Sequence, residues 1–177
     1  RPRRRDRHLR LEMVLLMHRI VTALSCSLLL VTACAAPQES QAPSNVPMSE
    51  LVVDLLDGEH LDLTEDLDAG RPVVLVFWQS WCASCLEEAP ALVEAHARYG
   101  DRITIVGVVS GPDSSVDEAK LIAALESTGM TYPQVRDRDL SLTRALGVQG
   151  TPTIIVLGPN GQVRYRGHDL PNWSSLL

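Results

Sequence analysis

Residues 73–85 read VVLVFWQSWCASC, an apolar run followed directly by two cysteines with two residues between them. Residues 73–77 are apolar without alternation and mostly β-branched, which is typical of a strand buried on both faces. A polar Gln-Ser pair interrupts the run, and the residues after the first cysteine favour a helix that begins there. The sequence therefore predicts that Cys82 and Cys85 lie where a buried strand gives way to a helix.

This position makes sulfur reactive. The unpaired N–H groups and the positive end of a helix stabilise a thiolate, and the thiolate is the nucleophile in disulfide exchange. We expect Cys82, at the helix start, to be the exposed nucleophile. Cys85 follows one turn later on the same helix face and would resolve a mixed disulfide from within. The alternative interpretation is a static structural disulfide.

Length and charge limit the class of protein. The chain has 177 residues, 45% of them hydrophobic, which is enough for one domain with a sizeable core and a tail. Its formal charge is −6, but seven arginines lie in residues 1–33. From Cys34 onward 9 of the 16 basic and 20 of the 22 acidic residues remain, a net charge of −11. Such an acidic body argues against nucleic acid as a partner and against charge-driven binding to anionic lipid.

The N-terminal segment has the features of an export signal. Residues 20–36 contain no charged side chain and follow a basic start. The junction Val-Thr-Ala-Cys at residues 31–34 resembles the lipobox of bacterial lipoproteins, which implies cleavage before Cys34 and lipidation of that cysteine. We interpret residues 1–33 as the signal; translation from Met17 would make residues 1–16 an over-extended gene start. The alternative is an uncleaved membrane anchor, since 17 residues is about the lower limit for a span.

Both interpretations place the remainder outside the cytoplasm. Residues 34–48 are rich in proline and small polar residues and are expected to form a flexible tether before a domain at 49–177. Cys26 would be discarded with the signal, so the domain retains one C-x-x-C pair. A single pair is a poor structural zinc site, and outside the cytoplasm it indicates a redox motif.

The rest of the domain alternates strands and helices. Hydrophobic periodicity and turn residues predict a mixed α/β sheet that ends in an antiparallel hairpin. Helical spacing predicts core faces formed by Leu86, Ala89, Val93 and Ala97 in one helix and by Leu121, Ile122 and Leu125 in the next. The expected elements are a hairpin at 51–63, a turn of helix at 64–67, a strand at 73–78, a helix at 83–99 bent at Pro90, a strand at 103–109, a helix at 116–128, an extended piece at 132–135, a short helix at 140–146, and strands at 153–157 and 163–166.

These residues resemble the thioredoxin superfamily, and within it the membrane-tethered TlpA/ResA/DsbE-like members. The similarity spans about residues 49–170. It rests on the Trp-Cys-Ala-Ser-Cys motif at 81–85, on Glu88 and Pro90, and on Gly-Thr-Pro-Thr at 150–153. The resemblance implies a thioredoxin-like fold with an N-terminal hairpin extension. The chain departs from the family at its C-terminus, where only a short or incomplete helix is expected.

The resemblance also implies roles for individual residues. Glu88 would be an acid near the thiols that assists proton transfer, with a pKa raised by partial burial; the alternative is a solvated helix residue. Thr151 and Pro152 would form a cis peptide that faces the cysteines and pairs with an extended substrate. Trp81 would shield the motif and contact substrate, whereas Trp78 is interpreted as core packing.

The leading functional hypothesis is therefore a lipid-anchored thiol–disulfide oxidoreductase of the cell envelope without a bound cofactor. Its partners would be protein disulfides or dithiols and an electron donor in the membrane, as in cytochrome c maturation. One alternative is a thiol peroxidase, which shares the fold. Another is a carrier in which Cys82 and Cys85 bind copper(I). His60, His96 and His168 are scattered and are interpreted as surface residues rather than metal ligands, because a metal site needs converging ligands.

Overall fold

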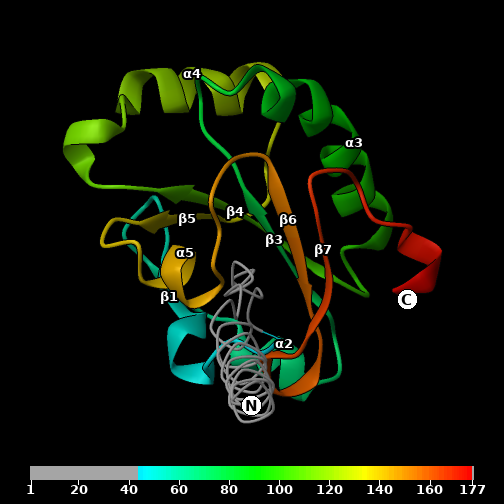
Figure 1. The fold of residues 1–177 in the computed structure, drawn as a ribbon. Coiled ribbons are helices and arrows are strands. Elements are labelled where there is room, and N and C mark those ends of the chain that lie inside the picture. The colour runs from blue at the N-terminus through cyan, green and yellow to red at the C-terminus, as the bar shows by residue number, and fades with distance from the viewer. Residues whose placement is uncertain (1–43, 177) are drawn as a thin grey trace, which may run out of the picture. The chain divides into compact units, whose positions relative to one another are not determined.

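The computed structural model describes residues 44–176. Its centre is a five-stranded mixed sheet in the order β5-β4-β3-β6-β7 (Figure 1). β3, β4 and β5 run parallel, and β6 and β7 are antiparallel to their neighbours, so the predicted α/β class is confirmed. The strands are β3 (Val73–Phe77), β4 (Thr104–Ser110), β5 (Gln134–Asp137), β6 (Thr153–Leu157) and β7 (Val163–Gly167).

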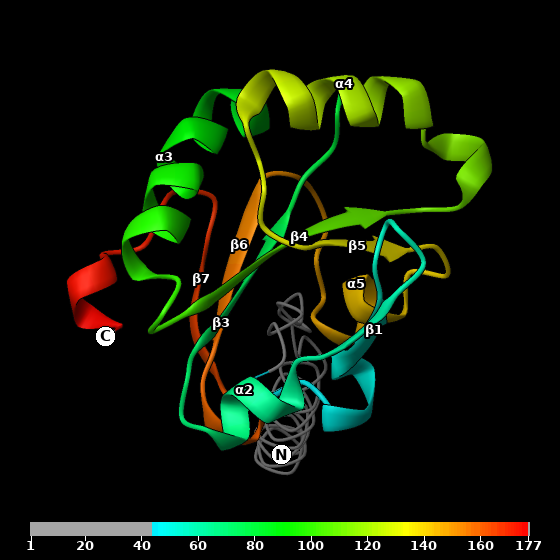
Figure 2. The same ribbon diagram turned by 180° about the vertical axis from the view of Figure 1, so that it is seen from behind.

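Helices cover both faces of this sheet, as Figures 1 and 2 show from opposite sides. The α-helices are α2 (Thr64–Asp68), α3 (Ala83–Tyr99), α4 (Glu118–Thr128) and α5 (Ser141–Ala145). Successive side chains of β3 point to opposite faces, because the side-chain period of a strand is two. Val74 and Val76 therefore join a core with residues of α3 and α4, and Leu75 joins a second core with residues of α2 and α5. All five residues of β3 are buried, as the sequence predicts for a central strand.

The N-terminal hairpin is a separate two-stranded sheet of β1 (Val52–Asp54) and β2 (His60–Asp62). It lies along β5, where Leu55 forms an isolated antiparallel bridge with Val135. The hairpin extension is thus confirmed, and it occupies an edge of the main sheet.

The expected tether is in part folded. Val46 is 2% exposed and donates its N–H to the Gly161 carbonyl (3.0 Å), and the Val163 N–H bonds the Ser44 carbonyl (2.8 Å). A short 3₁₀ turn, η1 (Met48–Leu51), follows. Part of the stretch expected to be tether is therefore attached to the domain, because one apolar side chain within it packs into the core.

The predicted signal at 1–33, the lipidated Cys34 and the first part of the tether lie outside the described residues. Within residues 44–176 there is no helix of the length and hydropathy needed to cross a membrane.

The core faces of two helices differ from expectation. α3 buries Cys85, Ala89, Leu92 and Ala95. Leu86 and Val93 lie at the edge of that stripe and are only partly buried, and Ala97 is exposed, because each lies roughly 100° around the helix from the Cys85 row.

In α4, Leu121 and Ala124 are buried, whereas Ile122 is 44% exposed. Successive residues of a helix are separated by roughly 100°, so Leu121 and Ile122 cannot share one face. The chain closes with 3₁₀ turn η4 (Trp173–Ser175) in place of a terminal α-helix, in line with the weak element expected there.

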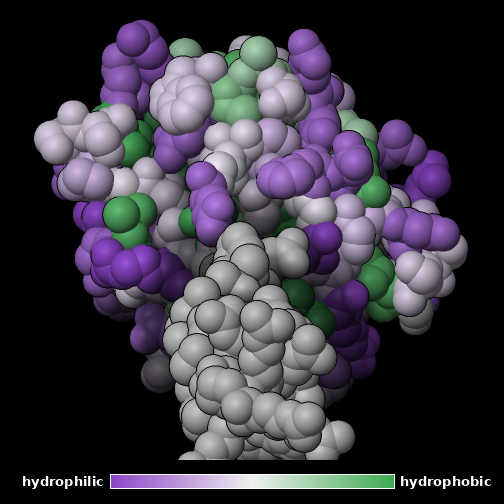
Figure 3. All heavy atoms as spheres, in the orientation of Figure 1, coloured by the Kyte–Doolittle hydropathy of each residue, from purple (hydrophilic) through white to green (hydrophobic). Residues whose placement is uncertain are grey.

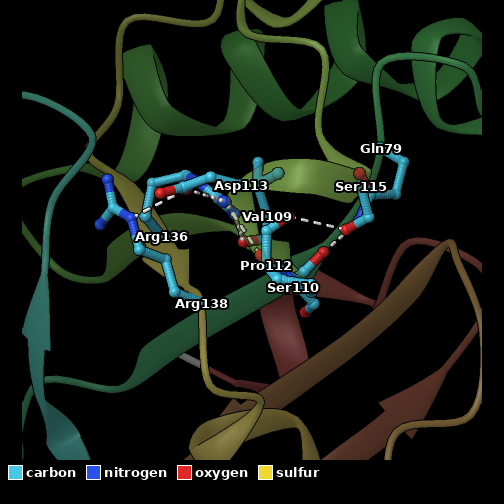
Figure 4. Close-up of polar contacts among 9 residues, drawn as sticks. Gln79, Val109, Ser110, Pro112, Asp113, Ser115, Arg136 and Arg138 are labelled. Carbon is cyan, nitrogen blue, oxygen red and sulfur yellow. Dashed lines mark hydrogen bonds and ion pairs between the residues drawn. The ribbon is translucent and has the colours of Figure 1, made fainter.

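Hydrogen bonds and ion pairs of polar side chains connect the ends of β4 and β5 (Figure 4). Arg136, whose side chain is 3% exposed, donates to the carbonyls of Val109 (2.6 Å) and Gly111 (2.9 Å) and to the Asp113 carboxylate (3.0 Å). Arg138 reaches the same carboxylate oxygen from the surface (3.0 Å). The loop after β4 is therefore fixed to β5 through one buried guanidinium.

The outer surface is mainly polar on the face drawn in Figure 3, where hydrophobic side chains form small separate groups. This agrees with the burial of the large apolar residues in the two cores. Trp78 is 2% exposed and belongs to the core beneath α3 and α4, so its interpretation as core packing is confirmed; Tyr132 lies in the same core.

Candidate active site

Cys82 and Cys85 form a disulfide at the junction between β3 and α3, with 5.3 Å between their Cα atoms. Cys82 is the N-cap of α3, and its Sγ accepts a hydrogen bond from the Cys85 backbone N–H (3.3 Å). The Ser84 hydroxyl lies 3.6 Å from the same sulfur and donates to it, because a disulfide sulfur carries no proton. The predicted strand-to-helix placement is confirmed, and two donors point at the sulfur of Cys82.

The burial of the two cysteines differs from expectation. Cys82 was expected to be exposed and Cys85 deeper, but their exposed fractions are 6% and 5%. The Cys82 sulfur turns inward because it bonds Cys85 and caps the first helical turn. The exposed neighbour is Trp81, whose relative exposure of 73% shows that its ring is not packed into the core.

The loop that carries Cys82 is held against β4. The Trp78 N–H bonds the Val108 carbonyl (3.1 Å), and the Gln79 side-chain amide donates to the Ser110 carbonyl (2.7 Å), a contact drawn in Figure 4. The Cys82 N–H then bonds the Gln79 carbonyl (3.0 Å). Gln79 is 9% exposed and hydrogen-bonded, so this polar residue holds the segment between β3 and α3 in place.

The Thr151–Pro152 peptide bond is cis, as predicted. The register of the sheet brings it to the same end of the central strands as the cysteines, because Phe77 at the end of β3 pairs with Thr153 at the start of β6. The Thr153 hydroxyl donates to the Gly150 carbonyl (2.7 Å) and closes the bend. Pro152 is buried and Thr151 is half-buried, so Thr151 is the more accessible of the pair.

Glu88 is half-buried on α3, whereas its neighbour Glu87 is exposed. Burial is the main cause that raises the pKa of Glu88; the nearby Asp169 raises the pKa further, and His168 lowers it. Its Oε2 is buried and has no hydrogen-bond partner among residues 44–176. Partial burial thus raises the pKa of Glu88, which is the direction and the cause expected from the sequence.

His168 is the site residue that the sequence interpretation missed. It lies on the surface, as expected, but its Nδ1 is 2.6 Å from the Pro152 carbonyl oxygen. The predicted hairpin turn at residues 159–161 was a partial signal, because it brings the residues after the second strand back towards those that precede the first.

The other two histidines of residues 44–176 lie elsewhere. His60 pairs with Asp54 (2.7 Å) on the exposed hairpin, and the His96 ring packs edge-on against Tyr132 (5.8 Å between centroids). In the part of the chain that the structure describes, no three His, Cys, Asp or Glu side chains converge as a metal site would require.

The fold and the site define a class: a thioredoxin-like α/β domain with a two-cysteine disulfide at the start of the helix after the central strand. Comparison with known proteins gives the family. The redoxin family model matches residues 37–173, and the chain belongs to the redoxin family.

Curated relatives match the same domain. The chain is 32% identical over 128 residues to the chloroplastic protein SUPPRESSOR OF QUENCHING 1 of Arabidopsis thaliana, covering 71% of this chain and 12% of that protein. It is 30% identical over 115 residues to the thiol-disulfide oxidoreductase ResA of Geobacillus thermodenitrificans, covering 65% of this chain and 63% of ResA. The chain thus spans less than two thirds of the length of these relatives.

Solved structures show the same fold. MTB DsbF, solved in mixed oxidized and reduced forms, superposes with a TM-score of 0.59 at 26% identity, covering 76% of this chain and 93% of the other. The exposed lipoprotein thioredoxin Etrx1 of Streptococcus pneumoniae superposes with a TM-score of 0.58 at 25% identity, covering 71% and 96%. The thioredoxin-like assignment made from the sequence is therefore confirmed.

Proposed function

We propose that this protein is a thiol–disulfide oxidoreductase that works by exchange through Cys82 and Cys85. The observation that carries the proposal is a disulfide between two cysteines at the N-terminus of α3, at the end of the central strands where the cis Thr151–Pro152 bond also lies. Support comes from ResA, a relative named as a thiol-disulfide oxidoreductase. The family match covers the whole of this site.

The first chemical step belongs to the reduced protein. The Cys82 thiolate attacks one sulfur of a substrate disulfide, forms a mixed disulfide, and displaces the other substrate sulfur as a thiolate. The Cys85 N–H and the Ser84 hydroxyl, which donate to the Cys82 sulfur in the oxidised form, are placed to stabilise negative charge on it. The N-terminus of α3 acts in the same direction.

The second step releases the substrate. Cys85 attacks the Cys82 sulfur, the Cys82–Cys85 bond forms, and the second substrate sulfur leaves as a thiolate. The Cys85 thiol must lose its proton in this step, and we assign its acceptance to Glu88. A carboxyl whose pKa is raised by burial exchanges protons closer to neutral pH than an ordinary glutamate does.

Substrate docking is assigned to Trp81, Thr151 and Pro152. The exposed Trp81 ring offers an apolar surface beside the disulfide. The half-buried Thr151 offers backbone groups in the loop before β6, at the same end of the sheet. An extended segment around the substrate cysteine would bind between them, in the way that peptides add to sheet edges.

The cellular setting is also a proposal. We infer an envelope protein anchored by a lipid on Cys34, which receives electrons from a membrane donor and reduces partner disulfides in a pathway such as cytochrome c maturation. The motif at 31–34 supports the anchor, and Etrx1 is itself described as an exposed lipoprotein. Mass spectrometry of the N-terminal peptide after expression in a bacterial host tests the lipid on Cys34.

Reduction of an insulin disulfide by the full chain, recycled with dithiothreitol, tests the catalytic assignment. Cys82→Ser and Cys85→Ser should each slow the reaction at least about 100-fold, because each removes a sulfur that must form a covalent bond. Cys26→Ser and Cys34→Ser are the matched controls and should keep the wild-type rate. Wild-type activity in Cys82→Ser would refute the proposed function.

A further inference from the structure

His168 contacts the cis-proline segment directly. Its Nδ1 lies 2.6 Å from the Pro152 carbonyl oxygen. A carbonyl oxygen only accepts, so Nδ1 carries a proton and donates it. Pro152 is buried while His168 is exposed, so a solvent-accessible imidazole is hydrogen-bonded to a buried part of the site.

The position of His168 is set by the end of β7. Gly167 pairs with Ile154 of β6, so the next residue of β7 comes beside the first residues of β6. The Tyr165 hydroxyl donates to the Asp169 carbonyl (2.7 Å) and ties down the segment after the strand. A Cβ atom at position 167 would collide with that hydroxyl, so only glycine leaves room for the arrangement.

Titratable groups from α3, β7 and the segment after β7 interact at this point. Glu88 faces it from α3, Tyr165 from β7, and Asp169 from its own segment. His168 lowers the pKa of Glu88, opposing the rise caused by burial and by Asp169. Tyr165 in turn has a pKa raised mainly by burial and further by Asp169 and Glu88. Within this group the imidazole is the side chain that can carry positive charge, beside the carboxyls of Glu88 and Asp169.

We propose that His168 is a positioning residue of the exchange site, which holds the Thr151–Pro152 segment in place through Nδ1 and, when protonated, favours the ionised form of Glu88. This role rests on the proposed function and adds a second titratable group to it. Histidine is the side chain that changes charge between about pH 5 and 8. His168 would therefore affect substrate docking through the Pro152 segment and proton transfer through Glu88.

Two substitutions separate the two effects. In His168→Asn the short amide N–H can take the place of Nδ1–H and keep the bond to the Pro152 carbonyl, but it cannot carry charge. His168→Ala removes both the bond and the charge. His60→Asn, on the exposed hairpin, is the matched control.

We expect His168→Ala to raise the KM for a disulfide peptide about fivefold, the equivalent of one hydrogen bond. His168→Asn should keep the KM within about twofold of wild type, but move the acid limb of the kcat/KM profile to higher pH, because the pKa of Glu88 rises when the cation is lost. An equal KM rise in both variants, or an unmoved acid limb in His168→Asn, would overturn the proposal.

A measurement without turnover keeps the inference separate from the proposed function. The ¹³C resonance of the Glu88 carboxyl carbon is titrated in the oxidised full chain, with amide spectra as the check of folding. The midpoint should be higher in His168→Asn than in wild type and unchanged in His60→Asn. Identical midpoints in all three proteins would overturn the role of His168, whereas a wild-type protein that reduces no disulfide would overturn the proposed function alone.

Discussion

At the scale of single residues, the ionised side chain of Glu88 lowers the stability of the folded protein. Its Oε2 is buried without a hydrogen-bond partner in the described residues, and burial raises its pKa above the ordinary value of 4.5. The folded protein therefore retains the Glu88 proton at pH values where the unfolded chain has lost it. Stability from this group falls as the pH rises through that window and is unaffected well below it.

Glu88→Gln should therefore raise the free energy of unfolding at neutral pH, because the amide removes a partly buried charge whose Oε2 has no hydrogen-bond partner in the described residues and whose burial outweighs the effect of His168. The gain should disappear below about pH 4, where the carboxyl is protonated in both states. Urea unfolding of the two proteins at pH 4 and pH 7 measures the difference. A variant that is less stable than wild type at pH 7 would show that the carboxylate has a favourable partner.

Residue types alone predicted part of the site. The apolar run before Cys82 and the Trp-Cys-x-x-Cys spacing are local signals, and they gave the correct strand-to-helix junction. The burial of Cys82 was not predictable from them, because it depends on the direction of the sulfur once the disulfide has formed. The cis state of Thr151–Pro152 was expected only from family resemblance, since few X–Pro bonds are cis in general.

At the scale of elements, the sequence interpretation missed two features: the register of the β6–β7 pair and the direction of the buried face of α4. The β6–β7 hairpin contains an irregularity between Val156 and Leu157, so its register could not be counted from the turn alone. That register is what places His168 beside Pro152. The face of α4 was misjudged for a similar reason, because apolar residues next to each other in sequence point in different directions around a helix.

The link between β4 and β5 makes an element-scale prediction. Arg136→Met should lower the free energy of unfolding by about 3 kcal/mol, because it leaves two buried carbonyls without their charged donor. Arg138→Met removes a donor to the same Asp113 carboxylate, but its side chain is 48% exposed. It should cost less than about 1 kcal/mol. Equal losses in urea unfolding would contradict the assignment of the link to the buried arginine.

At the scale of the whole molecule, the sequence order of strands and helices was sufficient to predict a layered α/β fold. The outer limit of the domain was not predictable, because composition made residues 44–48 look like tether. One valine within that stretch is buried and joins the core on the β1 and α2 side of the sheet. A single apolar residue in a polar segment is too weak a signal to separate a folded strand end from a linker.

The extent of the folded domain can be tested with matched valines. Val46→Ala should lower the free energy of unfolding by about 2 kcal/mol, from the lost burial of two methyl groups and the cavity left behind. Val52→Ala, at a position that is 56% exposed, should change it by less than about 0.5 kcal/mol. Thermal unfolding of the full chain measures both. An unchanged free energy of unfolding in Val46→Ala would show that residues 44–48 belong to the tether and not to the folded domain.

The catalytic account depends on Cys82 and Cys85 having different roles although their exposed fractions are almost equal. The most direct measurement is trapping of the mixed disulfide. Full-chain Cys85→Ser and Cys82→Ser, each in a Cys26→Ser/Cys34→Ser background and fully reduced, are mixed with a disulfide peptide, quenched with acid and analysed by mass spectrometry. The account predicts that Cys85→Ser accumulates the peptide on Cys82 and that Cys82→Ser accumulates little or none on Cys85. Faster capture by Cys85, or no adduct in either variant, would contradict it.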